Sequence, residues 1–233
     1  MKRMAAKSAL LLAFILAAPA SIANENPPDA LLRAVSAEVT DVLKQELERK
    51  PVDAAKIAAL VETRILPMVD FVQMTRLAMA RNWRLATPEQ QTVIADEFKT
   101  LLVRTYSPKL AQYSGEAVEV KQLGGGPHGA EVTVRSELNQ PGKARMSLDY
   151  EMQNTDAGWK IYDVKIGGVC LVNTYRDMFA EKVRLGGVAG LIKFLEDHNR
   201  EGGSKLAAVG HSLQAKTWAL YAIIQNMFRG GRQ

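Results

Sequence analysis

The chain has 233 residues, and its 30 Lys and Arg against 25 Asp and Glu give a formal charge of +5. The basic excess lies at the two ends, because residues 24–199 hold 22 basic and 24 acidic residues. This argues against a nucleic-acid-binding domain, which clusters Lys and Arg on its folded face. Cys170 is the single cysteine, which excludes an intrachain disulfide, and the three histidines lack ligand spacing, so we expect no metal site.

Residues 1–23 have the pattern of a secretory signal peptide. Three basic residues precede an apolar run from Ala9 to Ala18, and small residues at Ser21 and Ala23 fit cleavage after Ala23. The run is too short to cross a bilayer, which takes about 20 residues. We therefore expect an exported chain that is soluble after cleavage.

The next part of the sequence has the apolar spacing of helices. Leucine and valine recur at helical intervals over residues 29–49. Asp53 and Asp70 stand where the N-caps of a second helix, stopped at Pro67, and a short third helix are expected. The capping box of residues 87–90 begins a fourth helix, which Pro108 is expected to kink or end.

At Gly115 the apolar period changes from that of a helix to that of a strand. Apolar and polar residues alternate around 118–121, 132–135, 144–152 and 162–166, and turn-forming residues link these segments. Helical spacing returns over 172–183 and 188–196. The order predicts an α+β fold with helices packed on one four-stranded antiparallel sheet, strands in chain order.

Two motifs of enzymes have imperfect counterparts. Residues 124–129 match the dinucleotide pattern G-x-G-x-x-G, but a strand pattern follows them where a phosphate-binding helix is required, so we interpret them as a hairpin turn. Residues 210–214 resemble the nucleophile elbow of lipases, but they lack its last glycine and no histidine follows Ser212. Neither motif predicts a catalytic site.

Two strand carboxylates leave an enzymatic alternative open. Asp149 or Asp163 in an apolar pocket would serve as the general base of a small cone-shaped enzyme. Asp149 falls in the polar register of its strand, and Asp163 is expected to face away from the side of Tyr162. An ordinary exposed or hydrogen-bonded aspartate is the simpler interpretation of both residues.

Two stretches give the sequence a family character. One runs from Asn82-Trp83-Arg84 through 86–90 to 98–106, and the other covers 158–164, 168–169 and 171–176. With the signal peptide and the order of helices and strands, they resemble the MlaC-type periplasmic phospholipid-binding proteins, also called the toluene-tolerance family. The resemblance covers about residues 29–198, and Cys170 stands where this family often has serine.

The resemblance implies a soluble, non-catalytic periplasmic carrier with phospholipid as cargo and no cofactor. Such proteins move diacyl phospholipid between an outer-membrane lipoprotein–porin complex and an inner-membrane ABC transporter, with transient proximity to membranes, and thereby maintain outer-membrane lipid asymmetry (the Mla pathway). The implied fold encloses the acyl chains between helices and a curved, NTF2-like sheet. Another lipid, such as a hopanoid, and a small NTF2-like enzyme remain as alternatives.

The apolar strand and helix faces supply candidate walls for this lipid pocket, although the same periodicity describes a solid core. The candidates on the sheet are Val132, Val134, Met146, Leu148, Tyr150, Val164 and Ile166. The candidates on the helices are Phe71, Met74, Phe98, Leu101, Leu102, Tyr106, Tyr175 and Phe179.

The chain is thus expected to divide into a signal peptide (1–23), a lipid-binding α+β domain (24–199) and a C-terminal extension (200–233). The extension lies outside the resemblance and has apolar residues at helical spacing. Its uncharged segment, Thr217 to Phe228, is too short to span a bilayer. We expect a partly helical segment that packs on the body or is partly disordered, with an amphipathic surface helix as the alternative.

Overall fold

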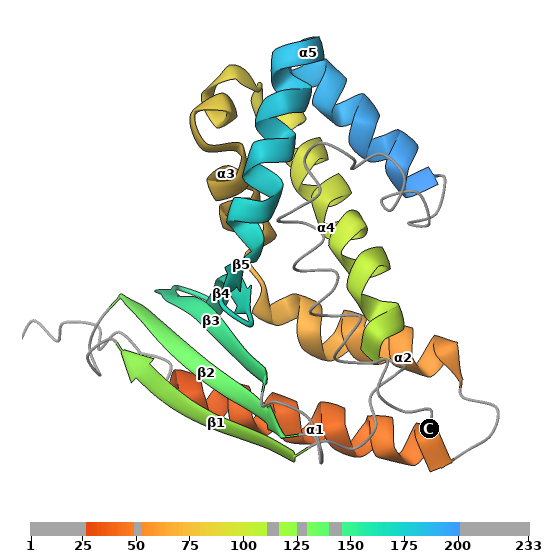
Figure 1. Cartoon of the computed structure of the whole chain (residues 1–233), viewed down its shortest axis with the longest axis vertical. Helices are drawn as coiled ribbons and strands as arrows, with labels where there is room; N and C mark the ends of the chain where they lie inside the picture. Colours follow the sequence, from red (N-terminus) through yellow and green to blue (C-terminus); the bar gives the residue numbers. More distant parts are fainter. Residues whose placement is uncertain (1–26, 49–52, 111–116, 125–129, 140–145, 201–233) are drawn as a thin grey trace, which may run out of the picture.

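The computed structural model describes residues 27–48, 53–110, 117–124, 130–139 and 146–200. The predicted signal peptide, the G-x-G-x-x-G turn after Gly124, the elbow-like motif and nearly all of the C-terminal extension lie outside these residues. Figure 1 shows two parts, one formed by the sheet with helices α1 and α2 and the other by helices α3, α4 and α5.

The first two helices are present, and the second begins at its predicted cap. Helix α1 spans Pro28–Glu48, and α2 spans Ala54–Leu60 with Asp53 as its N-cap, whose Oδ1 accepts from the backbone N–H of Ala55 at 2.9 Å. The predicted second helix continues to Pro67 with a different winding, as the π-helix η1 (Val61–Ile65) and the 3₁₀-helix η2 (Leu66–Met68). Apolar spacing alone does not distinguish these closely related windings.

The third and fourth helices are confirmed with their caps. Helix α3 spans Phe71–Met79, and Asp70 Oδ1 accepts from the N–H of Gln73 at 2.8 Å. After the 3₁₀-helix η3 (Ala80–Leu85), helix α4 spans Pro88–Leu110. Its capping box forms as predicted, with Thr87 and Gln90 exchanging two hydrogen bonds at 3.0 and 3.3 Å. Pro108 does not end the helix at once, because α4 continues two residues further.

The strands form one antiparallel sheet in the order β1-β2-β3-β4-β5. They span Ala117–Gly124, Glu131–Asn139, Met146–Thr155, Gly158–Ile166 and Val169–Cys170. The four expected strands are present, and the two-residue β5 is additional. It forms because Gly167 and Gly168 adopt φ values of 55° and 85°, which glycine tolerates and which turn the chain back on β4.

A bulge in β4 corrects one predicted side-chain direction. Glu151 pairs with Asp163 and Met152 pairs with Ile161, so Tyr162 is an extra residue between the two pairs. Tyr162 interacts electrostatically with Glu131, Glu151, Asp163 and Lys165. The expectation that Asp163 faces away from the side of Tyr162 is therefore wrong, because simple alternation does not anticipate a bulge.

Helix α1 covers one face of the sheet. Its Leu32 is buried together with Val132, Val134, Met152, Trp159 and Ile161. We call this group the sheet cluster, and it includes the half-buried side chains packed against it, which are Leu31, Val35, Val69, Val120, Tyr150 and Val164. Arg33 also donates to the carbonyl of Val120 on the edge strand at 3.1 Å. The second half of α1 packs instead on α2, through Leu43, Ile57 and Leu60.

Helices α3, α4 and α5 pack on one another and on the other end of the sheet (Figure 1). Helix α5 spans Leu171–Arg200 and bends at Gly187, so the two predicted helical segments form one bent helix. The segment before α3 is joined to the sheet by a hydrogen bond from Asp70 N to Ile161 O, at 2.8 Å. The far end of α5 is held to α4 by Asn199, whose Nδ2 donates to Glu97 Oε2 at 2.6 Å.

Candidate functional site

The predicted wall residues lie in two neighbouring apolar groups rather than on two facing walls. We call the group centred on α3, α4 and α5 the helical cluster. All eight predicted helix residues belong to it, together with Met146, Leu148, Val164 and Ile166 from the sheet. Val132, Val134 and Tyr150 lie in the sheet cluster, opposite α1, and Val164 contacts both clusters. The structure thus brings all fifteen residues into one continuous apolar interior.

The centre of the helical cluster is tightly packed. Phe98 and Phe179 have no exposed surface, and their ring centroids lie 5.0 Å apart in an edge-to-face arrangement. Tyr175 packs against Phe98 in the same way, at 4.8 Å. These rings already fill the space between α4 and α5. Among the fifteen predicted wall residues, those that are only partly buried are Phe71, Tyr106, Met146, Leu148, Tyr150 and Val164.

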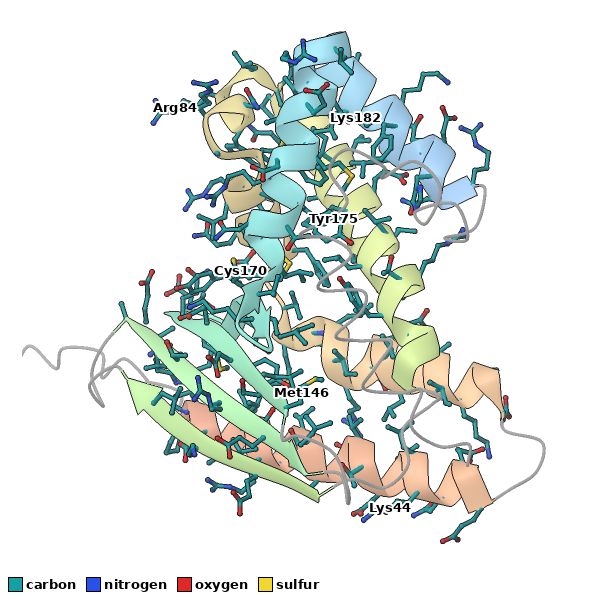
Figure 2. The ribbon with its side chains drawn as sticks, viewed as in Figure 1. Lys44, Arg84, Met146, Cys170, Tyr175 and Lys182 are labelled. Atoms are coloured by element: carbon teal, nitrogen blue, oxygen red, sulfur yellow. The ribbon has the colours of Figure 1, made fainter. Side chains whose placement is uncertain are left out.

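The apolar face of the sheet is covered unevenly. Val134 and Met152, near α1, are fully buried. Leu138, Met146 and Leu148 lie on the same face toward the other end of β2 and β3, and each keeps part of its surface accessible. Figure 2 shows Met146 at this end of the sheet. We call these three side chains the open end of the apolar face.

Ser136 and Tyr150 place hydroxyl groups on this otherwise apolar face. Ser136 is 2% exposed, and its Oγ donates to the hydroxyl oxygen of Tyr150 at 3.3 Å. Burial raises the pKa of Tyr150, and the hydrogen bond from Ser136 offsets this rise in part. The phenol therefore stays protonated at neutral pH and keeps a proton that it can donate. The sequence contained this signal as a serine in the apolar register of the strand pattern over 130–138, but Ser136 was not singled out.

A second pair of hydroxyls lies in the helical cluster. Burial raises the pKa of Tyr175 to about 12, despite hydrogen bonds from Tyr106 and Thr105 that favour its ionised form. Burial and the neighbouring Tyr175 raise the pKa of Tyr106 well above its usual value. Both phenols are therefore neutral over the physiological range. Neither one adds a charge to the apolar interior.

The two aspartates of the enzymatic alternative lie on the opposite, charged side of the sheet. Asp149 binds Arg135 through two hydrogen bonds of 2.5 and 2.7 Å. Lys165 likewise donates to Glu151 at 2.5 Å. A carboxylate held by a guanidinium on both oxygens is occupied as an acceptor. The polar register predicted for Asp149 is confirmed.

Asp163 has a structural role at the start of α5. Its Oδ1 accepts from the N–H of Val172 at 3.1 Å, which satisfies a backbone donor in the first turn. Its Oδ2 accepts from the thiol of Cys170 at 2.7 Å. Burial, followed by this hydrogen bond, raises the pKa of the Cys170 thiol to about 11. Asp163 thus joins β4, β5 and α5 and has no contact with the open end of the apolar face.

Within the residues that the structure describes, no group of three or more His, Cys, Asp or Glu side chains is arranged to hold a metal ion. Nor does any helix in the described ranges combine the length and apolar character needed to cross a membrane.

Comparisons with known proteins agree with this architecture. The family model described as MlaC protein matches residues 33–197. A curated relative, the toluene tolerance protein ttg2D of Pseudomonas putida, is 22% identical over 178 residues, which are 76% of this chain and 82% of the relative. A solved structure of a phospholipid-binding protein from Ralstonia solanacearum, in complex with a phospholipid, is 36% identical with a TM-score of 0.68. That similarity covers 76% of this chain and 98% of the other.

The family match extends over most of the chain and includes all helices from α2 to most of α5 and the whole sheet. The resemblance found in the two sequence motifs is thereby confirmed. This chain belongs to the MlaC protein family.

Proposed function

We propose that this protein binds diacyl phospholipid as a non-catalytic carrier. The observation that carries the proposal is the similarity, over 98% of the other chain, to a structure solved with a phospholipid bound. The partly accessible open end of the apolar face supports it, since it offers apolar surface next to a closed core. The pairing of Asp149 with Arg135 on the other side of the sheet supports a non-catalytic role.

Physical chemistry sets what such a carrier must do. Two acyl chains hold on the order of 30 methylenes, and at about 0.8 kcal/mol each their exposure costs roughly 25 kcal/mol. A carrier in water must therefore bury the chains almost completely. The charged phosphate is best left at the opening, because burying an unpaired charge is costly. The open end, with Leu138, Met146 and Leu148, is where we expect the chains to enter.

The cellular role follows from the family and is part of the proposal. We propose that the chain is exported, loses residues 1–23 and works in the periplasm. It then shuttles phospholipid between an outer-membrane lipoprotein–porin complex and an inner-membrane ABC transporter, and so helps keep phospholipid out of the outer leaflet. A carrier of another lipid, such as a hopanoid, is an alternative that lipid identification distinguishes.

The test is lipid extraction of the natively purified mature protein followed by mass spectrometry, with a matched pair of variants. Leu148→Gln places an amide on the apolar face, whereas Ser147→Gln places the same amide on the charged face one residue earlier in β3. An amide buried without a partner costs about 1–3 kcal/mol. We expect at least about fivefold less phospholipid per folded Leu148→Gln protein, and unchanged content in Ser147→Gln.

Circular dichroism checks that both variants are folded. Absence of any lipid from the natively purified wild type would contradict phospholipid carriage. Recovery of a hopanoid in place of phospholipid would support the alternative cargo. Equal lipid content in the two variants would remove Leu148 from the binding surface.

A further inference from the structure

The hydroxyl pair of Ser136 and Tyr150 lies at the border of the open end. Along β2, Ser136 follows the fully buried Val134 and precedes the partly accessible Leu138. Tyr150 pairs with Val134 across the strands, and its hydroxyl reaches diagonally to Ser136. The pair therefore marks the point where the closed sheet cluster gives way to accessible apolar surface.

Counting protons at this pair leaves one donor unused. The two hydroxyls carry two protons and share one hydrogen bond of 3.3 Å, drawn with Ser136 as the donor, so one proton of the pair is not used between them. Tyr150 has one hydroxyl proton of its own, and the bond with Ser136 is the one hydrogen bond recorded for its hydroxyl among the described residues. A donor at the edge of an apolar interior is better satisfied when an acceptor lies within reach. The hydroxyl of Tyr150 is thus suited to donate a hydrogen bond to an acceptor atom of the ligand.

A diacyl phospholipid offers two kinds of acceptor. Its phosphate oxygens are charged and are best left near water, because their burial is costly. Its acyl-ester carbonyls are neutral, lie at the head of each acyl chain, and move with the chains to the edge of an apolar site. The surroundings of Tyr150, with Val134 and Val164 on either side, suit the neutral carbonyl.

We infer that the hydroxyl of Tyr150 donates a hydrogen bond to an acyl-ester carbonyl of the bound phospholipid. The site then prefers ester-linked lipids to ether-linked lipids with the same headgroup and chains. This inference rests on the proposed function and adds a chemical reason for choosing among lipids. Tyr150 is on this view a specificity-determining residue, and Ser136 orients its hydroxyl.

The experiment is a direct competition between two lipids that differ only in this group. Delipidated full-length mature protein is incubated with vesicles that hold equal amounts of a diester and a diether phosphatidylethanolamine of the same chain length. The protein is then separated, and the ratio of the two bound lipids is measured by mass spectrometry. One neutral hydrogen bond corresponds to about a two- to tenfold enrichment of the diester lipid in wild type.

Three variants assign the effect. Tyr150→Phe keeps the ring but removes the donor, so the bound ratio should fall to that of the vesicles. Tyr162→Phe makes the same change on the charged side of the sheet and should keep the wild-type ratio. Ser136→Ala leaves the proton of Tyr150 in place and should keep most of the preference.

The outcomes separate the inference from the proposed function. Equal binding of both lipids by wild type, or an unchanged preference in Tyr150→Phe, overturns the inference and leaves phospholipid binding intact. Loss of the preference in Ser136→Ala but not in Tyr150→Phe also overturns it, because the donor is then the serine. Binding of neither lipid contradicts the proposed function itself.

Discussion

Adjacent glycines at the bend of α5 should respond in opposite directions to substitution by alanine. Gly187 has φ 65° and ψ −169°, whereas Gly186 lies in the helix just before it. A Cβ added at either position meets no atom within 4 Å. Any difference between Gly186→Ala and Gly187→Ala therefore comes from the backbone and not from a clash.

The magnitude follows from the two conformations. The region occupied by Gly187 is essentially restricted to glycine, and placing alanine there costs about 1–3 kcal/mol. In a helix, replacement of glycine by alanine stabilises by about 0.5–1 kcal/mol. The free energies of unfolding of Gly186→Ala and Gly187→Ala should thus differ by about 1.5–4 kcal/mol, with Gly187→Ala the less stable protein.

Urea unfolding of the delipidated mature chain, followed by far-ultraviolet circular dichroism, measures this difference. Both variants must give the slope of the wild type, so that their midpoints compare the same transition. If Gly187→Ala is as stable as Gly186→Ala, the bend does not require a glycine conformation. The division of α5 into two segments would then need another explanation.

Three further predictions concern the junction of β4, β5 and α5. The pKa of the Cys170 thiol is raised from 9.0 to about 11, so at pH 8 its thiolate fraction, and its rate of labelling by a disulfide reagent, should be about 100-fold lower than in urea-unfolded protein. Between about pH 9 and 11 the folded state keeps this proton while the unfolded state releases it, so the free energy of unfolding should fall as pH rises through that window. The free energy of unfolding of Cys170→Ser should fall less over the same window. Equal labelling rates in folded and unfolded protein would contradict the raised pKa. Asp163→Asn leaves one carbonyl oxygen for three donors, so it should lower the free energy of unfolding by about 1–3 kcal/mol while lipid content per folded protein stays unchanged. If the wild type turns over a substrate and Asp163→Asn abolishes that turnover, the enzymatic alternative is supported instead.

Interactions between residues close in the sequence made much of the fold predictable. Asp53, Asp70 and the pair Thr87 and Gln90 begin their helices as expected, because a cap depends on residues within one turn. The sheet order was also predictable, since short turns join successive antiparallel strands. The bulge at Tyr162 and the extra strand β5 were not, because they depend on how neighbouring strands meet.

The candidate site was predicted as a set of residues but not as an arrangement. All fifteen side chains lie in the apolar interior, yet Val132 and Val134 face α1 and not α3, α4 or α5. Periodicity gives the buried face of each element and not its partner. The contact of these side chains with a lipid stays a prediction, and so do the signal peptide, the domain boundaries and the role of residues 200–233.

The charge of +5 illustrates what the sequence determined by itself. Its distribution, the order of helices and strands, the caps and the family motifs are properties of short segments, and each is read directly from neighbouring residues. The tertiary structure alone decided that Phe98 and Phe179 close one part of the interior while Met146 and Leu148 keep accessible surface. It also decided that Asp149 pairs with Arg135 and that Tyr150 forms a hydrogen bond with Ser136 on the apolar face. Burial and hydrogen bonding depend on segments far apart in the chain, so no local pattern specifies them.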